Sequence, residues 1–434
     1  MRLPYRLVRP LARIALKIYF KNIYISGLEN LPQGKPIIFA ANHPTAFLEP
    51  CLLACLLPTP LHFMVRGDFF QKPIFRKMLE SLQMIPMYRK KDIGIKGVKN
   101  NFSSLDIVYD LLAENKAILI LAEGTTEHEK RLRPIQKGTA RMALGAIKKH
   151  PDLAVQIVPI GVNYADVLTF RSTVMLDIGP AIDVLSFLSK ADGHPAKAIK
   201  QLTTEVKSHL EKQVVVIDKV ADEVLTEQLL ELQRSQNDVK NFPSASRVPL
   251  EQEIQIAQAV NQMAVIEKDE LRKLVSSYFK ELSDLELKDK AIISADKPSF
   301  IASIALVFGF IPYLLGRLLN FLPLQFGKWW AENKVAEIVF YAPLKVSLTL
   351  GAYIFYALLL LLLALIIGQT WFWLSLLTIP LLGYFSLFYY EYREDWKAQR
   401  LVAKTDTTII DSLRNKRATI QKQLSVFFLS IDKK

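Results

Sequence analysis

The stretch IIFAAN, at residues 37–42, is a short apolar run that ends in a polar residue, and this pattern recurs along the first half of the chain. Similar runs lie at residues 62–67, 117–124, 154–164 and 174–180, and helix-forming stretches such as 75–83 and 137–149 lie between them. Strands that alternate with helices in this way are typical of an α/β fold with a covered sheet. We therefore predict a mixed sheet covered by helices over residues 25–190, with polar site residues at its strand ends.

The composition predicts a second, membrane-embedded part. The chain has 434 residues, of which 51% are hydrophobic and 22% are charged, and this excludes a disordered protein. Residues 346–390 carry no formal charge, and they are about twice as long as the ~20 residues that one helix needs to cross a bilayer. We expect a transmembrane helical hairpin that turns at 368–370. The cations that follow it, such as Arg393, predict a cytoplasmic tail over 391–434.

Two further segments lie between the α/β part and this hairpin. Residues 191–297 are polar and rich in Glu, Lys, Gln and Leu with helical spacing, which predicts a soluble helical region. Residues 298–328 are apolar over most of their length and include Pro312. We expect a re-entrant or interfacial hairpin there, with a single short membrane span as the alternative.

The net charge of +13 leaves two usual partner classes, nucleic acids and anionic membrane surfaces. Its distribution favours the membrane, because six cations recur at helical spacing and fall in one stripe: Arg2, Arg6, Arg9, Arg13, Lys17 and Lys21. Pro10 suits the first turn of a helix, which we expect from about 10 to 24. We interpret residues 1–24 as a basic amphipathic helix on the membrane surface. The alternative is an ordinary helix that packs on the domain with a solvated basic face. No nucleic-acid-binding pattern is present, so no nucleic-acid partner is expected.

His43 follows the first apolar run, next to Asn42, and Glu49 comes six positions after it. Imidazole titrates near neutrality, and a carboxylate on one ring nitrogen fixes the tautomer, so such a pair can take a proton from a hydroxyl. No Ser or Cys stands in a nucleophile-elbow pattern, so a covalent acyl-enzyme is not predicted. By spacing alone, the same pair also fits two structural residues.

Further polar residues follow other strands of the expected sheet. Gly124, Thr125 and Thr126 come after the run at 117–122, with Lys137 downstream, and a glycine and two hydroxyl residues flanked by cations suit an anionic ligand such as phosphate. Glu123, in the same segment, is a further candidate substrate-binding residue. Arg66 and Arg89 each follow an apolar segment, and arginine suits bidentate contact with a phosphate. His128 lies between two glutamates, but neighbouring positions converge poorly on one ion, so no metal site is expected.

Taken in this order, the motifs resemble those of the glycerophospholipid acyltransferase superfamily, the PlsC-like enzymes that acylate glycerol phosphate or lysophospholipids. The resemblance covers about residues 20 to 190. Asn42 and His43 resemble the catalytic histidine block, and MIPMYRK with Arg89 resembles the second block with its substrate-phosphate arginine. Glu123-Gly124-Thr125 resembles the third block. IVPIGVNY with Pro159 resembles the fourth, which is linked to acyl-donor binding or packing.

Two blocks depart from the usual family pattern. Leu48 stands where the family usually has Asp, and the acid is Glu49, one position later. A His-x5-Asp-Pro version occurs in the fungal-type glycerol-3-phosphate and dihydroxyacetone-phosphate acyltransferases, which this chain also resembles. Ala122 and Thr126 replace the usual Pro and Arg of the third block. Phosphate binding would then depend on other cations, namely Arg66, Arg89 or Lys137.

The resemblance implies a direct attack. His43, oriented by Glu49, would deprotonate a hydroxyl of glycerol 3-phosphate or 1-acylglycerol 3-phosphate, which then attacks the thioester of acyl-CoA or acyl-carrier protein. No metal or organic cofactor is expected. The expected partners are membrane lipids and these two substrates, with the catalytic domain on the cytoplasmic face of the membrane. A lysophospholipid-remodelling enzyme with another headgroup and a non-catalytic membrane lipid-binding protein remain as alternatives. The sequence leaves the acceptor, the donor and the oligomeric state open.

Overall fold

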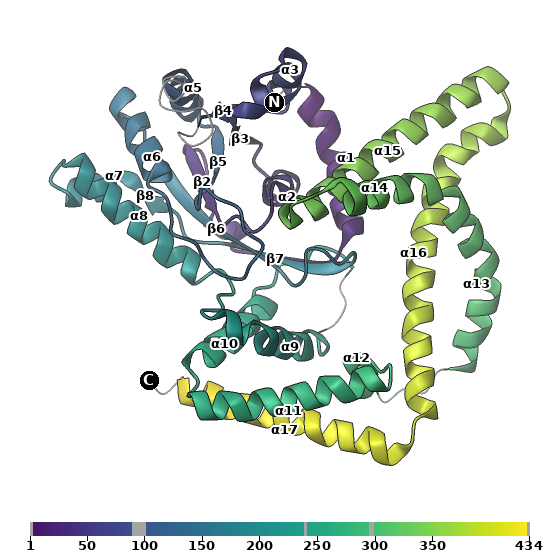
Figure 1. Cartoon of the computed structure of the whole chain (residues 1–434). Helices are drawn as coiled ribbons and strands as arrows, with labels where there is room; N and C mark the ends of the chain where they lie inside the picture. The colour runs from purple at the N-terminus through teal and green to yellow at the C-terminus, as the bar shows by residue number, and fades with distance from the viewer. Residues whose placement is uncertain (1–2, 89–100, 238–240, 295–298, 432–434) are drawn as a thin grey trace. The chain divides into compact units, whose positions relative to one another are not determined.

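The structure, a computed structural model, describes residues 3–88, 101–237, 241–294 and 299–431 (Figure 1). The chain divides into two compact units. The sheet unit comprises Met1–Val216, Val239–Leu250 and Val335–Val346. The helical unit comprises Ile217–Asp238, Glu251–Lys334 and Ser347–Lys434.

The sheet unit is built on an eight-stranded mixed sheet, as the apolar runs predict. Its strands are β1 (Phe20–Ser26), β2 (Ile37–Ala41), β3 (Leu61–Arg66), β4 (Met84–Met87), β5 (Ala117–Leu121), β6 (Gln156–Tyr164), β7 (Ser172–Ile178) and β8 (Ile182–Asp183). Their order is β1-β7-β6-β2-β5-β3-β4, and β8 pairs with β6. β2 runs parallel to both β5 and β6, whereas β6 and β7 are antiparallel. The central position of β2 explains its continuous apolar run, because both of its faces are buried.

Helices cover both faces of this sheet (Figure 1). They are α1 (Leu3–Tyr19), α2 (Leu48–Leu56), α3 (Pro73–Ser81), α5 (Asn101–Ala113), α6 (Gly138–Lys149), α7 (Val184–Lys190) and α8 (Pro195–Glu211). Phe39 and Ala41 lie in one apolar cluster with residues of α1 and α2. Ile38 and Ala40 lie in another with residues of α5, α6 and α8. Successive residues of one strand therefore fill two cores on opposite faces of the sheet.

The beginning of the chain differs from the prediction of a helix over 10–24. α1 spans Leu3–Tyr19 with Pro10 inside it, and β1 begins at Phe20. β1 pairs in parallel with β7, so the predicted boundary between residues 24 and 25 falls within a strand of the sheet. The reason is tertiary, because a strand partner about 150 residues away overrides the helical spacing of the local sequence. Arg2 lies outside the described residues.

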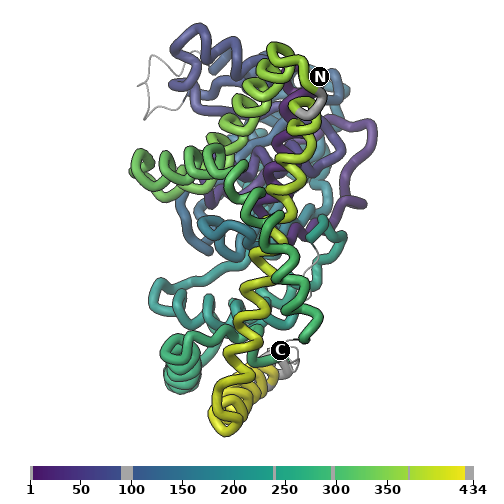
Figure 2. The backbone as a smooth tube through the Cα atoms, turned by 90° about the vertical axis from the view of Figure 1, so that its right-hand side faces the viewer, coloured from purple at the N-terminus to yellow at the C-terminus, as the bar shows by residue number. Residues whose placement is uncertain are grey.

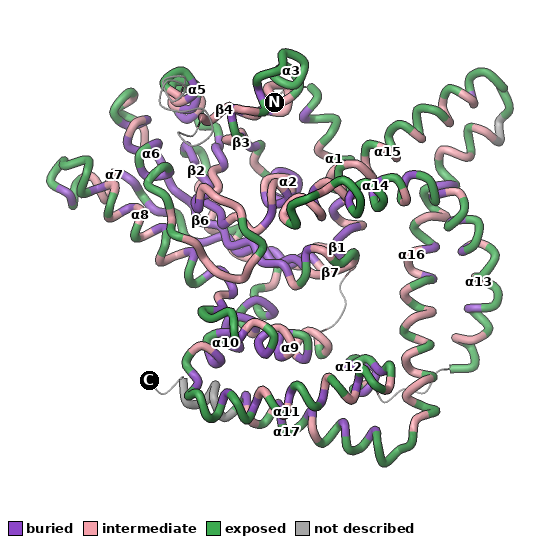
Figure 3. The backbone as a smooth tube through the Cα atoms, in the orientation of Figure 1, coloured by how far each residue is buried: buried purple, intermediate pink, exposed green. Residues whose placement is uncertain are grey.

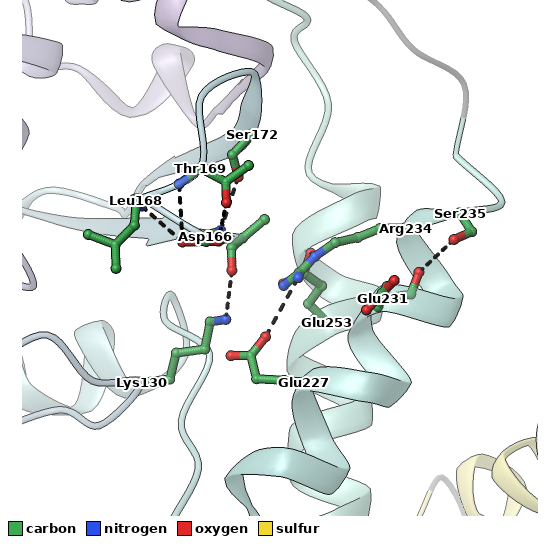
Figure 4. Close-up of polar contacts among 11 residues, drawn as sticks. Lys130, Asp166, Leu168, Thr169, Ser172, Glu227, Glu231, Arg234, Ser235 and Glu253 are labelled. Carbon is green, nitrogen blue, oxygen red and sulfur yellow. Dashed lines mark hydrogen bonds and ion pairs between the residues drawn. The ribbon is translucent and has the colours of Figure 1, made fainter. Parts of the chain in front are cut away.

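The helical unit contains most of α10 (Val248–Gln262) and of α15 (Ile338–Ile367) together with several complete helices. These are α9 (Glu223–Arg234), α11 (Val265–Asp284), α12 (Asp289–Ile293), α13 (Phe300–Leu319), α14 (Phe321–Lys334), α16 (Thr370–Lys404) and α17 (Thr407–Ile431). Buried ion pairs join some of them. Arg234 donates from Nε and Nη2 to the two carboxylate oxygens of Glu253, at 2.7 Å each (Figure 4). These contacts fix α9 against α10.

Three helices among the described residues are long and apolar enough to cross a membrane: α13, α15 and residues 372–404 of α16. Most of their surface is exposed, in contrast to the buried strands (Figure 3). α15 ends at Ile367 and α16 begins at Thr370, which confirms the predicted turn at 368–370. Residues 300–328 form α13 and the first part of α14, with Asn320 between the two helices.

α13 and α16 lie side by side within the helical unit (Figures 1 and 2). Gly316 allows a close approach, because a Cβ atom built on it would lie 2.2 Å from the Leu382 carbonyl oxygen. Two side chains of α16 donate hydrogen bonds to backbone carbonyls of α13, Ser386 to Tyr313 at 3.0 Å and Tyr389 to Leu306 at 2.7 Å. A small residue at the contact and hydrogen bonds between helices are typical of membrane helix pairs.

Candidate active site

The carboxyl ends of β2 and β5 bring two of the predicted groups of polar residues together. These strands are adjacent and parallel, with Ala41 opposite Leu121, so the residues that follow them emerge side by side. The backbone N–H of His43 donates to Glu123 Oε1 at 2.6 Å, although the two residues lie 80 positions apart. Their meeting follows from the sheet topology, since parallel neighbours end at the same edge.

His43 and Glu49 form a close pair. Glu49 lies in the first turn of α2, and its Oε2 is 3.3 Å from His43 Nδ1. The Glu49 side chain is completely buried, and that of His43 is 11% exposed. Because Nδ1 faces the carboxylate, it carries the proton in the neutral ring, and Nε2 is then the basic nitrogen. The pair thus has the geometry of a general base with an orienting carboxylate.

The second oxygen of Glu49 is held by two residues that the sequence analysis does not identify. Glu49 Oε1 accepts hydrogen bonds from Thr45 N–H at 3.0 Å and Thr45 Oγ1 at 2.7 Å. It also accepts one from Tyr164 OH, at 3.1 Å. Burial raises the pKa of Tyr164 well above its usual value, and the neighbouring Glu49 adds to this shift, so the phenol stays a donor. Three donors from two residues thus converge on this one buried carboxylate oxygen.

A sequence signal for Thr45 exists, but none exists for Tyr164. Thr45 Oγ1 accepts the backbone N–H of Leu48, the first residue of α2, at 3.1 Å. A Thr side chain commonly accepts a hydrogen bond from a nearby backbone N–H, and this local pattern could have been used. Tyr164 is the last residue of β6, 115 positions from Glu49, and only the sheet order brings it there.

Glu123 binds backbone groups. Its Oε1 accepts the N–H of His43, and its Oε2 accepts the N–H of Arg133 at 3.1 Å. Burial raises the pKa of Glu123, and the two backbone hydrogen bonds oppose that shift. Gly124 follows with a φ of +67°, a left-handed conformation that favours glycine. Both carboxylate oxygens of this predicted substrate-binding residue therefore hold the backbone around His43.

Two other predicted binding residues also contact the backbone. Asn42 Oδ1 accepts the N–H of Val162 at 2.7 Å, and its Nδ2 donates to the carbonyl of the same residue at 2.9 Å. These bonds join the end of β2 to β6. Pro159 lies inside β6 opposite Ala40, and its carbonyl accepts the N–H of Gly179 at 2.9 Å. Its position is that of a packing residue within the sheet.

The predicted phosphate ligands lie at less enclosed positions. Arg66 ends β3, pairs with Asp68 at 2.7 Å and is 45% exposed. Lys137 is exposed immediately before α6, and Thr125 and Thr126 are half-buried after Gly124. Arg89 lies outside the described residues. Within the described part of the chain, no group of three or more His, Cys, Asp or Glu side chains is placed to hold a metal ion.

The loop between β5 and α6 is attached to the sheet by a further cation. Lys130 Nζ donates to the carbonyl of Ala165, which directly follows β6, at 3.1 Å (Figure 4). In the same loop, Arg133 Nε lies 3.0 Å from Glu129 Oε1. Lys130 and Arg133 thus brace the loop that carries the N–H bound by Glu123.

Part of the sheet unit matches a known family. Residues 22–163 match the family model described as "Acyltransferase", so the chain contains an acyltransferase-family domain. The predicted resemblance to that superfamily is thereby confirmed.

Relatives of this domain are found in yeast. Glycerol-3-phosphate O-acyltransferase 1 of Saccharomyces cerevisiae is 35% identical over 111 residues, 25% of this chain and 15% of that protein. Glycerol-3-phosphate O-acyltransferase 2 of the same yeast is 28% identical over 204 residues, 45% of this chain and 26% of that protein. The matches thus cover 15% and 26% of the two yeast proteins. The solved structure of the 1-acyl-sn-glycerophosphate acyltransferase PlsC from Thermotoga maritima aligns with a TM-score of 0.35 and 16% identity, over 48% of this chain and 78% of that one.

Proposed function

We propose that this chain transfers a fatty acyl group from an acyl thioester to a hydroxyl of glycerol 3-phosphate or 1-acylglycerol 3-phosphate. The observation that carries the proposal is the His43–Glu49 pair at 3.3 Å, on an acyltransferase-family domain, with the carboxylate buried and the ring partly open. Both yeast relatives are named glycerol-3-phosphate O-acyltransferases, which favours glycerol 3-phosphate as the acceptor.

In this mechanism, His43 is the catalytic base and Glu49 positions it. Nε2 takes the proton of the acceptor hydroxyl while the oxygen attacks the thioester carbonyl. The C–S bond then breaks, and the leaving thiolate receives the proton back from the imidazolium. The Glu49 carboxylate stabilises the imidazolium that forms between these two steps. No metal or organic cofactor takes part. The thioester donor is acyl-CoA or acyl-carrier protein.

The acceptor phosphate needs cations, and the sequence motifs indicate three candidates. We assign this binding role to Arg66, Arg89 and Lys137, with Thr125 and Thr126 as hydroxyl donors. Arg66 is the last residue of β3, and Lys137 directly precedes α6. Arg89 is expected at the same edge from the sequence, because it follows an apolar segment. A guanidinium can bind two phosphate oxygens at once, which is the reason for giving the arginines priority.

Membrane lipids are the proposed surroundings of the enzyme. α1 exposes a stripe of apolar side chains, Leu3, Leu7, Leu11 and Ile14, beside the exposed Arg6 and Arg13. α3 has no buried residue and exposes Ile74, Phe75 and Met78 beside Lys72, Arg76 and Lys77. Apolar helix faces flanked by cations suit the surface of an anionic leaflet. Together with the positive-inside rule at Arg393, they favour a catalytic unit on the cytoplasmic face.

The test is a labelled-acyl transfer assay on the full chain in bilayers that contain anionic lipid. Glycerol 3-phosphate and 1-acylglycerol 3-phosphate are offered in parallel, with acyl-CoA or acyl-carrier protein as the donor. His43→Ala should lower the rate by about 10³-fold, because it removes general base catalysis. The matched control is His150→Ala, since His150 lies at the end of α6 and contacts Asp110. Transfer that survives in folded His43→Ala protein, or no transfer by the wild type to either acceptor, would overturn the proposal.

A further inference from the structure

A segment far along the chain belongs to the sheet unit. Residues 335–346 include the first turns of α15, the helix that continues as a candidate membrane span. Ala342 is completely buried in the same apolar cluster as Leu48 and Tyr164, and Val346 packs against that cluster. The beginning of the membrane helix is therefore part of the core beside the His43–Glu49 pair.

One hydrogen bond joins this segment directly to the turn that carries His43. The N–H of Ala46 donates to the carbonyl of Val339 at 3.0 Å. Ala46 follows Thr45, whose N–H and hydroxyl both bind Glu49 Oε1. The turn between His43 and Glu49 is thus bound at Thr45 by the Glu49 carboxylate and at Ala46 by the Val339 carbonyl of α15.

The Val339 carbonyl is available for this bond because of the residue four positions later. In an α-helix that begins at Ile338, the N–H of residue 343 would normally donate to the carbonyl of residue 339. Residue 343 is a buried proline inside the helix. Proline has no N–H, and its ring pushes away the carbonyl four residues earlier. The helix therefore leaves the Val339 carbonyl without its usual donor.

We propose that Val339 and Pro343 are positioning residues for the reaction. Pro343 keeps the Val339 carbonyl out of the helix ladder, and that carbonyl fixes Ala46. Through Thr45 and Glu49, this contact sets the orientation of the His43 ring. The membrane helix thereby acts as a part of the active site besides serving as an anchor. The kinetic part of this inference rests on the proposed function, and its structural part does not.

The test uses two changes to this one hydrogen bond in the full chain in bilayers. Pro343→Ala supplies a helix N–H that competes for the Val339 carbonyl. Replacement of Ala46 by lactic acid, which makes the backbone link an ester, removes the N–H donor and leaves the helix untouched. Pro380→Ala is the matched control, because Pro380 lies inside α16, in the helical unit.

We expect both changes to lower kcat about fivefold, the effect of one neutral hydrogen bond, with KM for the acceptor within about twofold of the wild type. In Pro343→Ala, amide exchange at Ala46 should become about tenfold faster. Pro380→Ala should leave both readouts unchanged. If Pro343→Ala does not fold, the Ala46 ester alone decides.

Unchanged kcat in the ester variant, or unchanged Ala46 exchange in folded Pro343→Ala protein, would overturn the inference. A fall that appears in KM and not in kcat would also overturn it. If the wild type transfers no acyl group, the proposed function fails, and the exchange measurement still tests the contact between Ala46 and Val339.

Discussion

The start of α2 and the loop after β5 each contain a buried glutamate, and both glutamates hold His43. They hold different atoms of it. Glu49 faces the imidazole ring and is itself held by two hydroxyls, whereas Glu123 accepts only backbone N–H groups. The imidazole ring of His43 is the group that can transfer a proton, whereas its backbone N–H determines where residue 43 lies in the fold. We infer that Glu49 contributes to catalysis and that Glu123 stabilises the fold around His43.

The two carboxylates also differ in their surroundings. Glu49 Oε1 has three donors, from Thr45 and Tyr164, and its other oxygen faces the ring. For Glu123, burial raises the pKa although two backbone bonds oppose the shift. The glutamate that faces the His43 ring thus accepts more hydrogen bonds than the glutamate that binds two backbone N–H groups. The following variants sharpen or break this comparison.

The largest effect is expected for Glu49→Gln. The amide cannot stabilise the imidazolium as a carboxylate does, so kcat should fall about a hundredfold, within the range typical of acid–base catalysis. Steady-state transfer in bilayers measures it. Glu211→Gln is the control, because Glu211 lies exposed on α8 beside Lys207. A kcat equal to that of the control would contradict the role given to Glu49.

Glu123→Gln should act on stability more than on rate. A carboxamide oxygen can replace only one of the two acceptors, so the free energy of unfolding should fall by about 2 kcal/mol. The rate per folded molecule should fall less than tenfold. Denaturant unfolding and transfer assays on the same samples separate the two. Retained stability with a large loss of rate would reverse the assignment of the two glutamates.

The stability effect of Glu123 should depend on pH with a definite sign. Burial raises its pKa in the folded protein above the ordinary 4.5, so the folded state binds the proton more tightly than the unfolded state. Its favourable contribution is complete below the unfolded pKa and is lost as the pH rises through the folded value. The stability of the wild type relative to Glu123→Gln should therefore be greater at acid pH than at neutral pH. Thermal unfolding at both pH values measures this difference, and the opposite trend would refute it.

Tyr164→Phe should have the smallest effect. It removes one of the donors to Glu49 Oε1 and leaves both donors of Thr45, so kcat should fall about three- to fivefold. Tyr109→Phe on α5 is the control, since Tyr109 packs against Gly145 in the other core. A loss as large as that of Glu49→Gln would mean that Tyr164 itself takes part in the chemistry.

Much of the sheet could be predicted from the sequence, because its central strands are buried on both faces. The runs at 37–42 and 117–124 contain β2 and β5, and the polar residues that end them do meet at one edge. The apolar length of residues 346–390 likewise predicts the break between α15 and α16, since this uncharged stretch is about twice the ~20 residues that one membrane span needs.

The contacts that depend on distant pairing could not be predicted. The local spacing predicts helix up to residue 24, whereas residues 20–24 belong to β1, which pairs with β7 about 150 residues away. Tyr164 and Val339 reach the His43 turn only through the strand order and the packing of α15. Local patterns identify residues whose side chains could bind substrate or transfer a proton. The fold determines which of their polar atoms are already hydrogen-bonded to the backbone. Asn42 and Glu123, predicted to bind substrate, illustrate this, because the backbone occupies their polar atoms.

The central claim is that Glu49 acts through the His43 ring. A double-mutant cycle tests it most directly, with Glu49→Gln made in the wild type and in His43→Ala, and the labelled-acyl transfer rate measured for all four proteins. We predict about a hundredfold loss in the wild type and less than a threefold change in His43→Ala, since residues that act as a unit are not additive. An equal loss in both backgrounds would contradict the account.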